Sequence, residues 1–306
     1  MGEHLGDSVK GASAAKVWGA LLAQERLPPA YALIAERWWR PLAQVIAADR
    51  RSAGAPLVVG INGGQGSGKS TLCQFLTALL ADEGMVAVTV SLDDFYLGRP
   101  ARQVLARDVH PLLATRGVPG THDVAALDNA ITALAGGGRA ILPRFDKAAD
   151  DRAPETSDAG PCDVILFEGW CVGASAQAPH QLAAPINPLE ADEDADGVWR
   201  AHVNAQLAGP YAALFARIDL MVALLPPDFA SVAANRRLQE EKLAARVGAD
   251  RVMDAAALAR FMSHYQRLTL HMLAEMPARA DVVVRLGPAQ RILEMVLRAP
   301  ARSLTT

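Results

Sequence analysis

A glycine-rich loop that carries one lysine, GINGGQGSGKSTL at residues 60–72, constrains the fold of this chain more than any other feature. The spacing of Gly63, Gly68, Lys69 and Ser70 fits G-x-x-x-x-G-K-[ST], the phosphate-binding loop. The apolar run PLVV stands directly before the loop, and the stretch KSTLCQFLTALLADEG, which has helical character, follows it. Because the motif works between a strand and a helix N-terminus, this context favours a nucleotide site over a glycine-rich turn with a chance lysine.

Each part of the loop has an expected role toward ATP and Mg²⁺. Lys69 should reach the β- and γ-phosphates, and the Ser70 hydroxyl should bind Mg²⁺. Thr71 can donate to the α-phosphate. The residues expected to bind the nucleotide are Gly63, Gly64, Gln65, Gly66, Ser67, Gly68, Lys69, Ser70 and Thr71. Small-molecule kinases, GTPases, motors and transport ATPases all use such a loop, so the loop does not separate these classes.

Short apolar runs that alternate with helical stretches predict the architecture. They lie at residues 57–61, 86–92, 140–145, 163–169, 220–226 and 281–287, and several are nearly all apolar, as in strands covered on both faces. We expect an α/β protein of P-loop NTPase type, with a doubly wound, mostly parallel sheet flanked by helices. Residues 14–27 and 30–50 have amphipathic helical spacing. They predict an N-terminal helical extension, residues 1–54, packed on a core domain of residues 55–306.

Other segments are expected to complete a site. Residues 98–124, 143–161 and 175–199 are expected to form loops around a second substrate, because long irregular loops in a compact domain are commonly functional or disordered. The acidic run from Glu190 to Asp196 fits a solvated surface better than a functional site. Residues 226–248 predict a helix in the position of a lid.

Composition narrows the classes of partner. The chain has 306 residues and a net charge of −3, which argues against a nucleic-acid partner. The start lacks the basic and apolar regions of a signal peptide, and no apolar run of about 18 residues occurs. Three cysteines, Cys73, Cys162 and Cys171, form no C-x-x-C pair and fit small buried residues in a reducing compartment. We expect a cytoplasmic protein without a membrane partner, and the oligomeric state stays open.

Acidic side chains follow two of the expected strands. Asp93 and Asp94 end the run at 86–92, and Glu168 lies at the end of the run at 163–169. Ligands of a doubly wound sheet bind beyond the carboxyl ends of its strands, so these acids should face the same crevice as the phosphate loop. Asp93 is the candidate general base, and Ser70, Asp93 and Glu168 are candidate Mg²⁺ ligands. For Asp94, a role as a turn or helix cap is as well supported as a role in the site.

These residues carry a family resemblance. A phosphate loop followed by S-x-D-x-F-Y, which here includes Asp93 and Tyr96, resembles the uridine kinase, pantothenate kinase and phosphoribulokinase group. The blocks SLDDFYL, RGVPGTHDV (116–124), PRFDKAADDR (143–152) and EGWCVGA (168–174) together resemble plant-type D-glycerate 3-kinase and its bacterial relatives. The segment at 186–204 is also similar to the bacterial members. The resemblance spans about residues 55 to 287. It implies an ATP-dependent kinase with Asp93 as base and a small hydroxy acid as acceptor.

A small anionic acceptor needs cations and hydrogen-bonding groups around it. Arginine suits bidentate capture of a carboxylate, and four cations are available in the family blocks. His122 and Asp123 lie before a predicted helix, which Asp123 or Thr121 could instead cap. Asp146 could bind substrate hydroxyls or pair with a neighbouring cation. The candidate acceptor-binding residues are Asp94, Tyr96, Arg116, His122, Asp123, Arg144, Asp146, Lys147 and Glu168, with Arg152 as a further cation.

Two adjacent arginines, Arg236 and Arg237, lie in the expected lid. A closing lid would bring positive charge to the γ-phosphate and exclude water, with Arg236 in a catalytic role and Arg237 on the nucleotide. The alternative is that both pair with Glu240 and Glu241 at helical spacing, which is worth only a few tenths of a kcal/mol, about 0.2–0.5 per pair.

Two alternatives to glycerate phosphorylation stay open. The acceptor could be a nucleoside or a pantothenate-like metabolite, although aromatic residues make up only 5% of the chain and a nucleoside pocket should offer stacking. The chain could also be a regulatory NTPase. The absence of an N-K-x-D guanine signature argues against a GTP switch.

Overall fold

The computed structural model describes residues 18–247 and 253–298. Residues 1–17 of the expected extension, residue 248 of the expected lid and residues 249–252 and 299–306 lie outside the described residues. The main sheet has the order β2–β5–β1–β6–β7–β8. The strands are β1 (Leu57–Gly63), β2 (Ala87–Ser91), β5 (Val164–Gly169), β6 (Leu220–Leu225), β7 (Val282–Leu286) and β8 (Ile292–Leu297). All pairs but the last are parallel, which confirms the expected doubly wound α/β fold.

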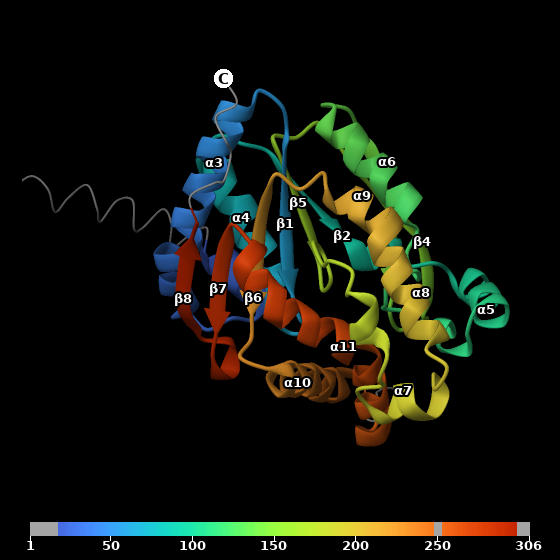
Figure 1. Ribbon diagram of the computed structural model, residues 1–306. Coiled ribbons are helices and arrows are strands. Elements are labelled where there is room, and N and C mark those ends of the chain that lie inside the picture. The colour runs from blue at the N-terminus through green and yellow to red at the C-terminus, as the bar shows by residue number, and fades with distance from the viewer. Residues whose placement is uncertain (1–17, 248–252, 299–306) are drawn as a thin grey trace, which may run out of the picture.

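Helices cover both faces of this sheet (Figure 1). On one face lie α3 (Arg40–Ala53), α4 (Lys69–Asp82) and the helical residues 18–25, with α2 (Tyr31–Ile34) and the π-helical turn Ala35–Trp39. On the other lie α6 (Val124–Ala135), α9 (Ala212–Phe215) and α11 (Ala255–Arg279). Strand β1 is buried throughout, and its side chains alternate: Leu57 and Val59 pack on the first face, and Val58 on the second. This double burial explains why the strand reads as an unbroken apolar run.

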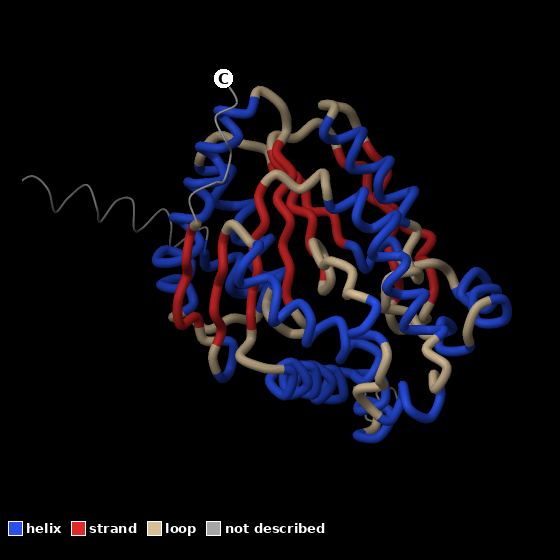
Figure 2. Tube along the Cα trace, viewed as in Figure 1, coloured by secondary structure: helices blue, strands red, loops and turns tan. Residues whose placement is uncertain are grey.

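One expected strand lies in a different sheet. The segment expected at 140–145 is β3 (Ala140–Asp146), which pairs antiparallel with β4 (Asp151–Ala159) in a separate two-stranded sheet. The expectation that residues 143–161 form an irregular loop is therefore wrong, since most of them belong to this hairpin. Figure 2 shows the hairpin beside the main sheet. Only one side of β3 is buried, and Ile141 is 62% exposed, so the strand lacks the double cover of the parallel strands.

The last strand, β8, was not expected. It pairs antiparallel with β7 at the edge of the sheet, and residues 287–291 form the turn between the two strands. Its residues are half-buried or exposed, and Arg285 pairs with Glu294 across the two strands. An edge strand with little buried surface carries a weak apolar signal.

Two buried ion pairs order the segment at 175–199, and one of them joins it to helix α11 of the core. It includes α7 (Pro188–Glu193) and leads into α8 (Val198–Gln206). Glu190 is fully buried and pairs with Arg267 of α11, with Nη2 and Oε2 2.6 Å apart. Asp194 is buried and pairs with Arg200 at 2.8 Å. The acidic run is thus not simply a solvated surface, because two of its carboxylates hold this segment in place.

Two helices lie at the rim of the sheet. Helix α5 (Arg99–Asp108) packs beside the β3–β4 hairpin, and α10 (Phe229–Val247) crosses the carboxyl edge of the sheet (Figure 1). In the described part of the chain, no helix is both long enough and apolar enough to cross a membrane.

Candidate active site

The phosphate loop joins β1 to α4 at the carboxyl edge of the sheet. Gly66 has φ +72°, in the left-handed region that favours glycine. A Cβ at Gly66 would lie 2.9 Å from Cβ of Asn235, and one at Gly64 would lie 3.0 Å from Cγ1 of Val232. Glycines at these two positions therefore let α10 rest directly on the loop.

The loop has the chemistry of an anion cradle. Lys69 Nζ donates to the carbonyl of Gly64 at 3.2 Å, which folds the lysine back over the loop. The Ser67 hydroxyl is buried and has no hydrogen-bond partner among the described residues. A buried hydroxyl without a partner is costly unless a ligand satisfies it, so this observation fits a bound phosphate.

Thr71 contacts the N-terminal segment. Its hydroxyl donates to Glu25 Oε2 at 3.1 Å. Nearby, Trp18 stacks on Phe75 of α4, with ring centroids 4.9 Å apart. The N-terminal helical segment thus packs on the helix that follows the phosphate loop, and it places a carboxylate beside a hydroxyl expected to face the nucleotide.

Glu168 lies at the end of β5, between two hydroxyls. Its Oε1 accepts from Ser91 at 2.9 Å and from Ser70 at 3.3 Å, and the side chain is buried. Hydroxyl and carboxylate oxygens suit Mg²⁺, which commonly takes one or two carboxylates and completes its shell with water and phosphate oxygens. No group of three or more His, Cys, Asp or Glu within residues 18–247 and 253–298 could hold a metal ion. Ser70 and Glu168 therefore fit an ion that is shared with a nucleotide.

Asp93 follows β2 in a 3₁₀ turn, Leu92–Phe95, and meets two donors. Its Oδ2 accepts from Lys147 Nζ at 2.6 Å, and its Oδ1 accepts from the Tyr96 hydroxyl at 3.0 Å. Burial alone would raise the pKa of Asp93, but the Lys147 ammonium and, to a smaller extent, Lys69 outweigh it and hold this pKa well below its usual range. Asp93 is thus ionised and lies within electrostatic reach of Lys69 of the phosphate loop.

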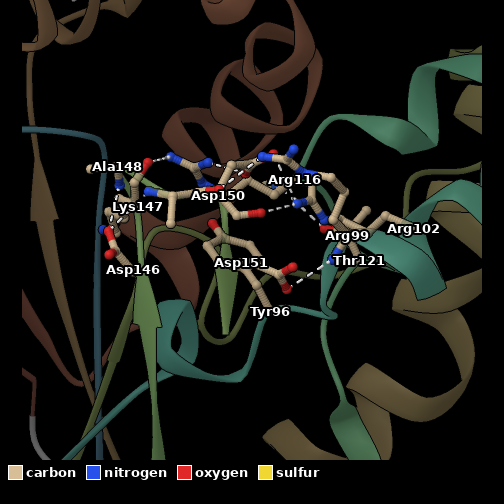
Figure 3. A network of polar contacts seen from close by, with 12 residues as sticks. Tyr96, Arg99, Arg102, Arg116, Thr121, Asp146, Lys147, Ala148, Asp150 and Asp151 are labelled. Atoms are coloured by element: carbon tan, nitrogen blue, oxygen red, sulfur yellow. Dashed lines mark hydrogen bonds and ion pairs between the residues drawn. The ribbon is translucent and has the colours of Figure 1, made fainter. Parts of the chain in front are cut away.

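The β3–β4 turn brings Lys147 to Asp93. Figure 3 shows this turn beside cationic side chains from two other segments. Arg102 is buried and donates to the carbonyls of Leu97 and Asp150 at 3.0 and 2.6 Å, while Arg116 pairs with the Asp150 carboxylate. These contacts fix the turn, and with it the backbone that carries Lys147.

Several expected acceptor ligands bind one another in this structure. Arg144 donates to Asp94 at 3.0 Å, and Asp94 also accepts from the backbone N–H of Phe145. The remaining contacts are Arg152 with Asp123 at 2.9 Å, Asp123 with the N–H of Ala126, and Asp146 with the N–H groups of Ala148 and Ala149. Asp123 thus caps α6, and Asp146 closes the hairpin turn. The charges of Arg144 and Arg152 are therefore partly neutralised by these carboxylates.

His122 is buried against two tyrosines. Its ring stacks on Tyr96 with centroids 4.4 Å apart, and Nδ1 lies 2.6 Å from the Tyr211 hydroxyl. Burial lowers the pKa of His122 to about 4, so the ring is neutral at neutral pH. Burial also raises the pKa of Tyr96, which keeps its hydroxyl protonated as a donor to Asp93.

The two lid arginines differ in environment. Arg236 pairs with Glu240 one turn along α10, and its guanidinium carbon lies 5.7 Å from the centroid of the Phe261 ring. Arg237 is exposed and forms no ion pair with any residue that the structure describes. Arg236 therefore forms the expected ion pair with Glu240 at helical spacing. The exposed Arg237 side chain could contact a nucleotide.

Sequence reasoning missed three residues of this site. Ser91 was assigned only to an apolar strand, and Arg102 only to a helix. Tyr211 lies 89 residues from the histidine that it contacts. Only the family block at Ser91 offered any signal, because the serine opens the motif S-x-D-x-F-Y.

Comparison with known proteins identifies the family. No family model matches the chain. The chain is 33% identical over 225 residues to the uncharacterised kinase mug58 of Schizosaccharomyces pombe, an alignment that covers 69% of this chain and 79% of that protein. It is 30% identical over 244 residues to the chloroplastic D-glycerate 3-kinase of Arabidopsis thaliana, and this covers 74% of this chain and half of the plant protein.

A solved structure adds the fold. The D-glycerate 3-kinase of Cryptococcus neoformans superposes with a TM-score of 0.73 at 25% identity, covering 86% of this chain and 99% of that protein. On these identities, coverages and fold, the chain belongs to the family of P-loop kinases that includes the D-glycerate 3-kinases.

Proposed function

We propose that this kinase transfers the γ-phosphate of ATP to a hydroxyl of D-glycerate or a similar small hydroxy acid. The observation that carries the proposal is the ionised Asp93, flanked by Lys147 and Tyr96 and within electrostatic reach of Lys69. A hydroxyl acceptor needs a carboxylate beside it and cations around the transferring group, and this arrangement supplies both.

In the proposed reaction, Asp93 accepts a hydrogen bond from the acceptor hydroxyl. Each of its oxygens already accepts one bond, and a carboxylate oxygen can accept a second. The bond from the acceptor oxygen to the γ-phosphorus forms as the bond from that phosphorus to the β,γ-bridging oxygen breaks, and the hydroxyl proton passes to Asp93. Lys69 stabilises negative charge on the phosphates. Mg²⁺, held by Ser70 and Glu168, would supply further charge neutralisation.

The acceptor carboxylate would bind among the cations near the β3–β4 turn. Lys147 is 60% exposed along its side chain, so its ammonium can turn toward a ligand at little cost, and Arg116 lies beside it, held by Asp150. We propose that α10 acts as the lid, because Val232 and Asn235 already contact the phosphate loop and Arg237 is exposed and forms no ion pair with a described residue. Residues 55–306 would then form the catalytic domain, with the N-terminal helices as a supporting layer.

The test is a panel of acceptors, with ADP release measured by a coupled assay and the phosphorylated product identified by mass spectrometry. D-Glycerate should stimulate ADP release and yield a phosphoglycerate, while L-glycerate, uridine and pantothenate should stimulate it weakly. Stimulation by a nucleoside or by pantothenate alone would reassign the acceptor. Hydrolysis that no small acceptor changes would favour a regulatory NTPase. Lys69→Ala, which removes the lysine of the phosphate loop, is the control for contaminating kinases.

A further inference from the structure

A buried nitrogen of His122 has no partner within the described residues. His122 is 5% exposed, and its Nε2 atom forms no hydrogen bond there. The same ring is otherwise tightly held, by stacking on Tyr96 at 4.4 Å and by the Tyr211 hydroxyl at Nδ1. Buried polar side-chain atoms are rarely left unsatisfied unless a ligand or water completes them. The Nε2 atom is therefore a buried polar group whose hydrogen bond is left for a ligand or a water molecule.

The neighbours of Tyr211 decide which nitrogen of His122 carries the proton. Tyr211 is fully buried, and its hydroxyl accepts the backbone N–H of Gly120 at 3.0 Å. The hydroxyl has one proton of its own, and His122 Nδ1, 2.6 Å away, is the acceptor that the structure offers it. When Tyr211 donates to Nδ1, that nitrogen is unprotonated, so the proton of the neutral ring is on Nε2.

We propose that Tyr211 is a positioning residue that fixes His122 as a neutral Nε2–H donor to the carboxylate of the acceptor. This inference rests on the proposed function and deepens it. The two groups beside Tyr96 have complementary chemistry: Asp93 only accepts hydrogen bonds, which suits the acceptor hydroxyl, and the Nε2–H group only donates, which suits a carboxylate. A hydroxy acid carries both a hydroxyl and a carboxylate, so its two functional groups match the chemistry of Asp93 and His122.

The tautomer can be measured in the full-length protein without turnover. ¹⁵N chemical shifts of the histidine ring nitrogens distinguish the two tautomers, and His122→Gln assigns the signals among the seven histidines. The ring should be the Nε2–H tautomer in the free protein, and its Nε2–H signal should shift when D-glycerate is added. In Tyr211→Phe, the protein should show a mixture of tautomers. An Nδ1–H tautomer in the unmutated protein would overturn the proposal.

Kinetics provide a second readout. A glutamine amide nitrogen reaches the position of Nε2 and an asparagine amide nitrogen that of Nδ1, so His122→Gln should retain more kcat/KM for D-glycerate than His122→Asn. Tyr211→Phe should raise the KM for D-glycerate about tenfold and leave the KM for ATP nearly unchanged, because one hydrogen bond to the acceptor is weakened. Equal losses in both histidine variants, or equal effects on both KM values in Tyr211→Phe, would show a merely structural role.

Tyr31→Phe is the matched control. Tyr31 is partly buried and accepts one hydrogen bond from Trp39, but it lies on the opposite face of the sheet. It should change neither the histidine tautomer nor the KM for D-glycerate. If D-glycerate does not stimulate the unmutated enzyme, the proposed function fails, while the tautomer of the free protein still tests the role of Tyr211.

Discussion

Replacing Asp93 by asparagine separates catalysis from binding and folding. The amide oxygen can keep the bond from the Tyr96 hydroxyl, and the amide nitrogen takes the place of Oδ2 beside Lys147. Lys147 is 60% exposed, so its ammonium can move into water, and losing such a pair costs about 0–1 kcal/mol of folding free energy. The change in shape is negligible. Stability and nucleotide affinity should therefore stay close to those of the unmutated protein.

The effect on turnover should be far larger. General base catalysis is typically worth about 10²–10⁴ in rate, which corresponds to about 2.7–5.4 kcal/mol in the activation barrier. Asp93→Asn should lower kcat for glycerate phosphorylation by this factor, measured by ADP release at saturating ATP. Binding of ADP with Mg²⁺, measured by isothermal titration calorimetry, should change by no more than about threefold, because the proposal assigns Mg²⁺ to Ser70 and Glu168 and Asp93 is not in the phosphate loop.

Asp94→Asn is the matched control for Asp93→Asn. It removes the same charge one residue away, but Asp94 binds Arg144 and the backbone of the β3–β4 hairpin. Its kcat should fall by less than about tenfold. Turnover in Asp93→Asn within about threefold of the unmutated enzyme would refute the role of Asp93 as base. Equal losses in the two variants would attribute the effect to the position of the hairpin.

Three further substitutions test the packing around the site. Gly66→Ala should lower the free energy of unfolding by about 1–3 kcal/mol in thermal or urea denaturation, because it adds left-handed backbone strain and a clash with α10. Gly84→Ala is the control, because Gly84 has a similar φ of +77° but open space around it. It should lower the free energy of unfolding by no more than about 1–2 kcal/mol. Glu25→Gln should tighten ADP binding by about two- to fivefold in calorimetry, since it removes a carboxylate hydrogen-bonded to the loop helix; unchanged or weaker binding would contradict that reasoning. Arg267→Ala should lower the free energy of unfolding in denaturant by about 3–5 kcal/mol, because Glu190 would keep a buried charge without its partner. A decrease below about 1 kcal/mol would show that the pair contributes little to stability.

The parallel sheet was predictable from the sequence because double burial leaves a strong signal. Strands such as β5 and β6 are buried at every position, so they read as continuous apolar runs. The β3–β4 hairpin was not predictable in the same way. Strand β4 is mostly polar and exposed on one side, and its sequence DRAPETSDA reads as a loop.

Local motifs predicted that Lys69, Asp93 and Glu168 follow or end strands of the sheet, and the structure has them there, while their chemical roles stay predictions. The site was not predictable where distant residues meet. Tyr211 reaches His122 only through the packing of the helices beside the sheet, and Arg267 reaches Glu190 across 77 residues. Such pairs leave no spacing pattern, so one sequence alone could not distinguish the buried carboxylates of residues 190–196 from solvated ones.

The most direct test of the proposed chemistry is a crystal structure with a non-hydrolysable ATP analogue, Mg²⁺ and D-glycerate. The proposal predicts that a glycerate hydroxyl lies within about 3.2 Å of an Asp93 carboxylate oxygen and faces the γ-phosphate held by Lys69. An acceptor bound elsewhere, or Asp93 turned away from Lys69 with packed protein between them, would contradict it.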